Sequence, residues 1–371
     1  MKKILLISAF VPSRKTAGQN YTRQLIEDLS GRYEVDLICF KNRSEAEGIA
    51  VPDTNMLKCI VVDKKDKLFN ALKLPFLHPI FTARFQWSVV RYIRKNKHRY
   101  DALIFNFGQV FAYALFAGHS RKIVITHDVM IQKFSRQKNI FGYLENRFVK
   151  FSERLLYKTA TLIFCHSPKD ETLIRNIYSV KAHHISLYFD ELLLRTDYKT
   201  IVPKDYFVMY GAWGRKENTE GLTWFLDEVF PRTPRLNIKI IGGNMPSDVR
   251  RKIDETDRVE YLGFVENPYG YIAEAQGLIA PLFHGAGIKV KVVEALALGT
   301  PVLGSAVAWE GIDLYLPLGE HTRIVDTPEG YVRILENRRP VTIADKIRLA
   351  QSFRAKYQTK SILGDFYKLN P

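Results

Sequence analysis

Cysteine is scarce in this sequence of 371 residues. Cys39, Cys59 and Cys165 are its only three cysteines, they lie far apart, and no two of them form a C-x-x-C pair. An odd number at this spacing provides neither a disulfide framework nor a zinc site. We therefore expect a reducing compartment, the cytosol, and no metal centre.

Long apolar runs are also missing. The run that follows Lys2 and Lys3 is seven residues long and ends at Pro12, which favours a first β-strand over a signal peptide. The stretch 102–118 is interrupted by Asn106, Gly108 and Gln109. This pattern favours a strand followed by a helix over a membrane span.

Acidic residues are few in the first half of the chain. Residues 1–185 contain 31 Lys+Arg and 15 Asp+Glu, whereas residues 186–371 contain 24 of each. The whole net charge of +16 therefore comes from the first half. Such an asymmetry indicates an acidic partner for that half.

The pattern of apolar segments predicts two α/β domains. A hydrophobic content of 46% and a charged content of 25% are typical of a globular protein, and the length suggests two domains. Apolar strand-like runs alternate with helical patterns in each half, which predicts doubly wound parallel sheets. The predicted strands are 3–10, 35–40, 59–62, 102–105, 123–126 and 161–165 in the first half, and 206–210, 238–241, 259–262, 277–280, 301–303 and 322–325 in the second.

The segment 281–305, PLFHGAGIKVKVVEALALGTPVLGS, carries the strongest functional signal. Gly285 and Gly287 allow a close backbone approach to a ligand before a helix predicted at 288–298. The first N–H groups of a helix have no internal partner and suit an anion, and Lys289 and Lys291 add positive charge there. Glu294 stands in an otherwise apolar run, where its carboxylate can accept two ribose hydroxyls.

This segment resembles the nucleotide-binding signature of retaining family 4 glycosyltransferases, in the subgroup with a Gly-x-Gly-Ile-Lys-x-Lys-x-x-Glu-Ala pattern. The resemblance implies the GT-B fold, with two Rossmann-like domains facing a central cleft. It also implies a nucleotide diphosphate sugar as donor substrate, with no cofactor and no metal. The donor-binding residues in this segment would be Gly285, Ala286, Gly287, Ile288, Lys289 and Glu294.

Two further segments resemble donor-binding loops of that family. In YGAWGRKEN, 210–218, the family's arginine and lysine positions hold Ala212 and Glu217, so Arg215 and Lys216 are the candidates for the diphosphate. In YLGFV, 261–265, Phe264 and Val265 would contact the base, although an ordinary strand end explains this segment equally well.

A departure from the family pattern concerns the donor sugar. The common motif has glutamates at both ends of an E-x7-E spacing, and the first position here is Ala286. Recognition of the donor sugar must then differ from that in the rest of the family or use backbone groups.

The first half contains two candidate sites of its own. His127 and Asp128 follow a strand and resemble the family's His-Asp position, where the histidine contacts the transferred sugar and the aspartate orients it or fixes the loop. Gly18 lies in the loop 12–20, which is expected to lead into a helix near 21–29. This loop would meet the donor, but a plain βα loop is an alternative.

Residues 64–100 contain ten Lys+Arg and one acid, with aromatic residues between them. The segment 131–160 has a similar composition. Basic amphipathic helices with aromatic residues suit an anionic bilayer, and the alternative is a solvated helix whose apolar side faces the core. We expect a membrane- or acceptor-facing surface made of Arg84, Trp87, Arg91, Arg94 and Lys95.

Together these patterns predict a bacterial-type glycosyltransferase, peripheral on the inner face of the cell membrane. It would transfer a sugar to a lipid-linked or growing glycan of lipopolysaccharide, capsule or exopolysaccharide. We expect residues 1–190 to bind the acceptor, 191–350 to bind the donor, and 351–371 to form a helix that crosses back to the first domain. An inactive nucleotide-sugar-binding scaffold, an epimerase and a nucleic-acid-binding protein are the alternatives, and no motif supports nucleic acid. The sequence leaves the oligomeric state open.

Overall fold

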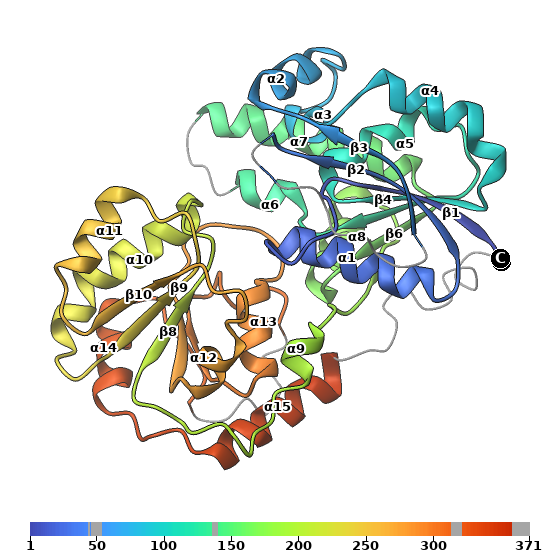
Figure 1. The fold of residues 1–371 in the computed structure, drawn as a ribbon. Coiled ribbons are helices and arrows are strands. Elements are labelled where there is room, and N and C mark those ends of the chain that lie inside the picture. The colour runs from blue at the N-terminus through green and yellow to red at the C-terminus, as the bar shows by residue number, and fades with distance from the viewer. Residues whose placement is uncertain (44, 46–53, 136–139, 313–320, 358–371) are drawn as a thin grey trace. The chain divides into compact units, whose positions relative to one another are not determined.

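Two parallel β-sheets organise the chain, one in each of two units, Met1–Tyr188 and Phe189–Gln358 (Figure 1). The computed structural model describes residues 1–43, 45, 54–135, 140–312 and 321–357. All strand pairs within both sheets are parallel. The predicted fold class, two Rossmann-like domains, is confirmed.

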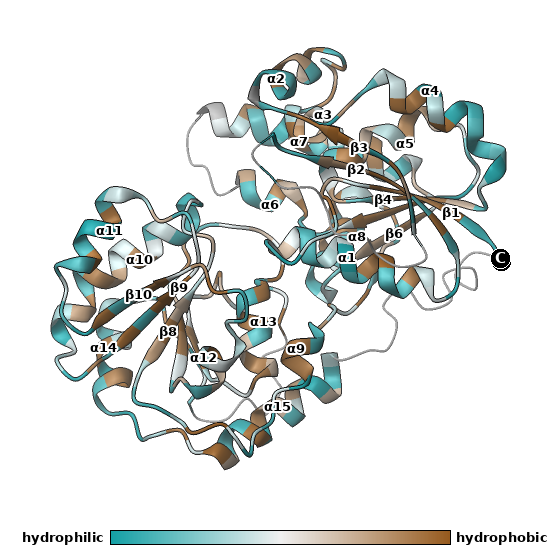
Figure 2. Cartoon of the chain, viewed as in Figure 1, coloured by the Kyte–Doolittle hydropathy of each residue, from teal (hydrophilic) through white to brown (hydrophobic). Residues whose placement is uncertain are grey.

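The first sheet has seven strands in the order β3-β2-β1-β4-β5-β6-β7. Its central strands are almost wholly apolar and buried, as expected where helices cover both faces of a parallel sheet (Figure 2). Its strands are β1 Lys3–Ser8, β2 Glu34–Lys41, β3 Thr54–Val61, β4 Ala102–Asn106, β5 Lys122–Thr126, β6 Leu162–Cys165 and β7 His183–His184. Its α-helices are α1 Ala17–Ser30, α2 Lys64–Leu72, α3 Pro79–Thr82, α4 Trp87–Asn96, α5 Ala112–Phe116, α6 Met130–Ser135, α7 Ile140–Thr159 and α8 Pro168–Tyr178.

The second sheet has six strands in the order β10-β9-β8-β11-β12-β13. Its strands are β8 Phe207–Tyr210, β9 Ile238–Ile241, β10 Val259–Gly263, β11 Gly277–Ala280, β12 Val302–Gly304 and β13 Arg323–Ile324. Its α-helices are α9 Glu191–Leu194, α10 Lys216–Glu228, α11 Ser247–Asp254, α12 Tyr269–Glu274, α13 Val290–Ala297, α14 Pro328–Glu336 and α15 Ile343–Tyr357. Short 3-10 turns at Lys97–Arg99, Gly108–Val110 and Phe230–Arg232 complete the two units.

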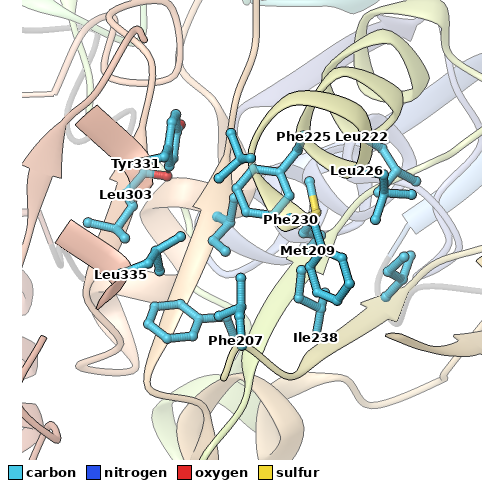
Figure 3. Close-up of a cluster of buried hydrophobic side chains, with 14 of the residues drawn as sticks. Phe207, Met209, Leu222, Phe225, Leu226, Phe230, Ile238, Leu303, Tyr331 and Leu335 are labelled. Carbon is cyan, nitrogen blue, oxygen red and sulfur yellow. The ribbon is translucent and has the colours of Figure 1, made fainter. Parts of the chain in front are cut away.

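The core of the second unit forms where α10 and α14 pack on the sheet. Phe225 of α10 and Tyr331 of α14 meet edge to face, with ring centroids 5.6 Å apart. Figure 3 shows both side chains in the same buried cluster as Phe207 and Met209 of β8. Burial of these large side chains contributes most of the stabilisation of such a unit.

Two predicted helix starts are corrected. Helix α1 begins at Ala17, four residues before the predicted start, because the Thr16 side chain caps it by accepting from the Gln19 N–H. Gly18 therefore lies in the first turn of a helix and not in a loop. Helix α13 begins at Val290, two residues after the predicted start, because Gly285 and Gly287 adopt positive φ angles of 131° and 66° in the preceding turn.

The end of the chain was predicted to cross back to the first unit. Residues 351–357 belong to α15, where the Arg354 guanidinium donates to the carbonyl of Ala297 at 2.7 Å within the second unit. Residues 358–371 lie outside the described residues. Within the described part of the chain, every helix is too short or too polar to cross a bilayer.

Candidate active site

The glycine-rich turn lies at the carboxyl edge of the second sheet, where open parallel sheets bind ligands. Its start is held by Ser305, whose hydroxyl accepts from the Leu282 N–H at 3.0 Å and donates to the Leu282 carbonyl. At its end, Lys289 is the N-cap residue of α13 and no side-chain hydrogen bond caps this helix among the described residues. The Val292 N–H donates to the Lys289 carbonyl, so the N–H groups of Val290 and Lys291 are the ones at this helix start that suit an anion.

Lys289 has a structural task in this turn. Its ammonium group donates to the carbonyls of Gly287 at 2.6 Å and Ala286 at 3.2 Å, and lies 3.6 Å from a carboxylate oxygen of Glu310. These contacts hold the Lys289 side chain against the backbone of the turn. They leave Lys289 less suited to a phosphate than the sequence indicated.

Lys291 is a candidate site residue that the predicted set omitted. Its ammonium group donates to Asn218 Oδ1 at 2.8 Å and lies 5.9 Å from the centroid of the Trp213 ring. Burial, with smaller contributions from the positive charges of Arg215 and Lys289, lowers its pKa to about 7 against the opposing effect of Glu217. A Cβ at Gly211 would lie 2.9 Å from this ammonium, so the glycine makes room for it. A phosphate beside Lys291 would restore its charge.

Glu294 lies one turn further along α13, on the same side as Lys291. One carboxyl oxygen accepts from the Tyr269 hydroxyl at 3.2 Å. Burial raises the pKa of Glu294 to about 8, and the negative charge of Asp190 acts in the same direction. A second carboxyl oxygen remains for a ligand hydroxyl, and the Tyr269 bond fixes the orientation of the group.

The other predicted donor-binding residues separate into two groups. Arg215 is the exposed N-cap residue of α10 and lies close enough to Lys291 to affect its pKa. Lys216 instead forms an exposed ion pair with Glu220 at 3.3 Å, so the structure does not bring it to the site. Phe264 is exposed and Val265 half-buried, both just beyond β10 at the same carboxyl edge. The Phe264 ring is available for stacking with a base.

In the first unit, His127 directly follows β5 and is oriented by Asn106 at the end of the neighbouring strand β4. Its Nε2 lies 2.9 Å from Asn106 Oδ1, while the Asn106 amide donates to the Ser8 hydroxyl at 3.1 Å. Because the Asn106 oxygen is the acceptor, His127 Nε2 carries the hydrogen and Nδ1 has a free lone pair. Burial holds the pKa of His127 well below its usual value, with a further decrease from His166. His127 is therefore a neutral imidazole whose Nδ1 can accept a ligand hydroxyl.

Asp128 was expected to orient His127 or to fix the loop. Its backbone carbonyl accepts from the Thr126 hydroxyl at 2.9 Å, whereas Asn106 is the side chain bonded to His127. Gly18 packs against Phe10, whose ring carbons would lie 3.0 Å from an added Cβ. The glycine thus lets α1 begin directly beside the end of β1.

Polar atoms with unmet hydrogen-bond capacity surround His127. Among the described residues, the buried Tyr21 hydroxyl and Gln19 Oε1 have no hydrogen-bond partner. The rings of Tyr21 and His166 lie 4.3 and 4.6 Å from that of His127, measured between centroids. Buried polar groups without partners are unfavourable by about 1–3 kcal/mol each. Their gathering here indicates a place for a polar ligand.

The predicted membrane-facing surface needs correction. Arg84 is only 6% exposed and packs over the Phe10 ring at 5.1 Å, so it is not available to a bilayer. Trp87 is 44% exposed and contacts the Phe85 and Phe116 rings. Arg91, Arg94 and Lys95 are exposed on α4, but the apolar side of this helix packs into the core.

Exposed apolar side chains gather instead on α7 and α2. Leu144 and Phe151 of α7 are 60% and 55% exposed, and Arg147, Lys150, Arg154 and Lys158 are exposed on the same helix. Positions 144, 147, 151, 154 and 158 repeat every three or four residues and share one face. On α2, the exposed apolar residues are Leu68, Phe69 and Leu72. This exposed face of α7 has the composition that the sequence had suggested for α4.

Residues 204–337 match the family described as Glycosyl transferases group 1. The match contains Lys291, Glu294 and the loop after β8, but not the first unit. No curated protein sequence matches the chain.

Several solved structures resemble the whole chain. Sucrose-phosphate synthase from Thermosynechococcus elongatus superposes with a TM-score of 0.70 at 17% identity, covering 100% of this chain and 99% of that one. WaaG, a glycosyltransferase of lipopolysaccharide biosynthesis, gives 0.68 at 14% identity, covering 99% and 97%. HepE of Anabaena in complex with UDP gives 0.62 at 15% identity, covering 96% of each chain. At these identities the likeness establishes the fold, GT-B.

Proposed function

We propose that the chain is a glycosyltransferase, as the match of residues 204–337 to the family described as Glycosyl transferases group 1 supports. It transfers a sugar with retention from a nucleotide diphosphate donor to a lipid-linked or growing glycan. The product belongs to a cell-surface polysaccharide, such as lipopolysaccharide, capsule or exopolysaccharide. The second unit binds the donor nucleotide and the first unit binds the acceptor.

The pair Lys291 and Glu294 on α13 carries this proposal. The first-turn amides of α13, the Lys291 ammonium and the nearby Arg215 surround the place for a diphosphate. One helical turn away, the free oxygen of Glu294 accepts a ribose hydroxyl while Tyr269 holds the other oxygen. The Phe264 ring stacks on the base. HepE, a structural neighbour, is in complex with UDP, which makes UDP the first probe to use.

Transfer requires charge stabilisation on the leaving diphosphate. The bond between the anomeric carbon and the β-phosphate oxygen breaks as the acceptor oxygen bonds to the same face of the sugar. The acceptor proton passes to the departing phosphate oxygen. Lys291 and the α13 amides stabilise the growing charge without requiring a metal, and His127 Nδ1 accepts a sugar hydroxyl.

The exposed face of α7 supports docking at an anionic membrane surface. Its leucine and phenylalanine suit the bilayer interface, and its three exposed cations, Arg147, Arg154 and Lys158, suit acidic headgroups. The enzyme then works from the inner face of the cell membrane, where lipid-linked acceptors are displayed.

Ala286 and Glu217 favour a second candidate, a scaffold that binds a nucleotide sugar without transferring it. Both positions differ from the common family pattern. Lys291 supplies a cation in place of the one missing at 217, which argues for activity. Slow hydrolysis of a UDP-sugar by the purified protein separates the two, because a scaffold releases no UDP.

The test of the donor site is calorimetric titration with UDP. Glu294→Ala removes the ribose acceptor and should weaken UDP binding at least about tenfold, since a hydrogen bond to a charged group contributes about 1.5–3 kcal/mol. Glu228→Ala, at an exposed position near the end of α10, is the control and should leave the affinity unchanged. Equal affinity in both variants would remove the ribose role of Glu294.

A further inference from the structure

Two cysteines that lie far apart in the sequence are neighbours in the first sheet. Strands β2 and β3 are parallel, and their register places Cys39 directly opposite Cys59 in a stretch that is regular from Ile38 to Lys41. Neighbouring strands lie about 4.7–4.9 Å apart, and a disulfide joins residues whose α-carbons are about 4.4–6.8 Å apart. The backbone spacing at this pair therefore allows a bond between the two sulfurs.

The two thiols also contact each other through their side chains. Both cysteines are free, and a side-chain hydrogen bond with Cys59, together with burial, raises the pKa of the Cys39 thiol, against a smaller opposing effect of Lys41. Cys39 is fully buried, whereas Cys59 is half-buried. Cys39 is thus the thiol that stays protonated, and Cys59 is the thiol that a small reagent in solution meets first.

The third cysteine belongs to a different part of the sheet. Cys165 ends β6, where its buried thiol donates to the carbonyls of Ser167 at 3.6 Å and His183 at 3.8 Å. Strands β1, β4 and β5 lie between β2 and β6, which separates Cys165 from the pair by roughly 19 Å at the ordinary strand spacing. In the folded chain, Cys39 and Cys59 can therefore bond only to each other.

The pair lies where a bond would fix an edge of the sheet. Strand β3 stands at the edge and pairs with β2 alone among the described strands (Figure 1). Cys59 lies two residues before the end of β3, and Asp63, the N-cap residue of α2, follows soon after. Exposed edge strands open more easily than central ones. A covalent bond here would hold β3 against β2 close to the start of α2.

We propose that Cys39 and Cys59 form a modification site at which a peroxide creates a reversible disulfide between β2 and β3. The proposal does not depend on the activity of the enzyme. Disulfides in a reducing compartment are usually transient and redox-sensing, so the pair agrees with the cytosolic location expected from the sequence.

The reaction has two steps. The Cys59 sulfur attacks a peroxide oxygen, so that an S–O bond forms, the O–O bond breaks, and the leaving hydroxide takes the Cys59 proton to become water. The Cys39 sulfur then attacks the Cys59 sulfur. The S–S bond forms, the S–O bond breaks, and the second hydroxide takes the Cys39 proton. The two thiols lose two electrons in all, and one hydrogen peroxide becomes two waters. A thiol reductant restores both cysteines by exchange.

Treatment of the folded full chain with hydrogen peroxide tests this site. The number of reactive thiols, titrated after denaturation, should fall from three to one, and mass spectrometry of the digested chain should find the Cys39 and Cys59 peptides linked. Dithiothreitol should restore all three thiols. Cys165→Ser is the matched control and should keep the link, whereas Cys59→Ser should form none. Cys39→Ser lacks the second thiol and should accumulate a sulfenic acid at Cys59, which dimedone traps.

Three outcomes would overturn the proposal: oxidation of Cys59 in the wild type without a link, a link that forms only in urea, or a link between two chains. Hydrogen exchange of the β3 amides gives a second readout. Oxidation should slow it about tenfold in the wild type and in Cys165→Ser, because opening of the edge strand is restrained, but not in Cys59→Ser. Unchanged exchange in the linked wild type would contradict the fixing of β3 against β2.

Discussion

At the scale of single residues, we expect the proposed binding of the donor by Lys291 and Glu294 to depend on pH. Burial sets the pKa of Lys291 to about 7 and that of Glu294 to about 8. Above pH 7 the free lysine loses its charge, and below pH 8 the free carboxyl is protonated. The diphosphate prefers a charged ammonium at Lys291, and the ribose prefers a charged carboxylate at Glu294. Near neutral pH, binding must therefore protonate Lys291 and deprotonate Glu294.

The affinity for UDP should therefore have a maximum between pH 7 and pH 8, and decrease on both sides. Lys291→Arg keeps its charge at high pH and should flatten the alkaline side of this profile. Glu294→Gln has no titrating carboxyl and should flatten the acidic side. Calorimetric titrations with UDP from about pH 6 to about pH 9 measure the profile. A wild-type affinity independent of pH would show that neither group is recharged on binding, and a profile that changes in one direction only would show that one of them does not contact the nucleotide.

Only part of this site follows from the sequence. The spacing of Gly285, Gly287 and Glu294 along one segment is local, so it can be recognised without a structure. The contacts of Lys291 with Asn218, and of Glu294 with Tyr269, join residues 73 and 25 positions apart. Only the packing of α13 against α10 and α12 reveals them. Asn218 belongs to the segment 210–218 that resembles a donor-binding loop, but the candidates predicted there were the charged residues Arg215 and Lys216.

At the scale of elements, strands were predictable wherever an apolar run is buried on both sides. Strands β9 and β11 have the predicted bounds. Strand β3 begins at Thr54, five residues before the predicted start, because this edge strand is largely exposed and its polar residues hide the pattern. Strand β7, with two histidines, has no apolar signal at all. Edge strands pair through backbone groups, which the sequence does not display.

Helix α15 is anchored by a buried lysine. The Lys346 ammonium is wholly buried and donates to the Ala275 carbonyl at 2.5 Å. Burial lowers its pKa to about 7 from an ordinary value of 10.5. Between these two values the unfolded chain binds one proton more than the folded chain. The contribution of Lys346 to the free energy of unfolding therefore increases with pH across this window.

We expect the unfolding free energy of the second unit to gain up to about 1.4 kcal/mol per pH unit from this lysine above pH 7. Lys346→Met should abolish that gain. Lys199→Met, at an exposed position in the same unit, should preserve it. Urea denaturation of the full chain at pH 7, 8 and 9 measures the slope. An identical pH dependence in the wild type and Lys346→Met would mean that the buried amine stays charged.

At the scale of the whole molecule, the charge asymmetry coincides with the division into units. The excess of Lys+Arg lies within residues 1–185, close to the first unit, Met1–Tyr188. The sequence alone could assign this charge to a unit but not to a face. Within the basic segment 64–100, α4 turns its apolar side inward and Arg84 is buried, whereas Leu68, Phe69 and Leu72 of α2 are exposed. The face that combines exposed cations with exposed apolar residues belongs to α7.

Replacement of three cations on α7 should release the enzyme from anionic vesicles. Each Lys or Arg near such a surface contributes about 1 kcal/mol, so Arg147→Glu, Arg154→Glu and Lys158→Glu together should weaken binding at least about a hundredfold. The matched control, Arg91→Glu, Arg94→Glu and Lys95→Glu on α4, changes the net charge by the same amount and should lose far less. Co-sedimentation with vesicles containing phosphatidylserine measures both variants. Equal losses would mean that net charge alone attracts the protein, and an unaffected α7 variant would exclude this helix as the docking face.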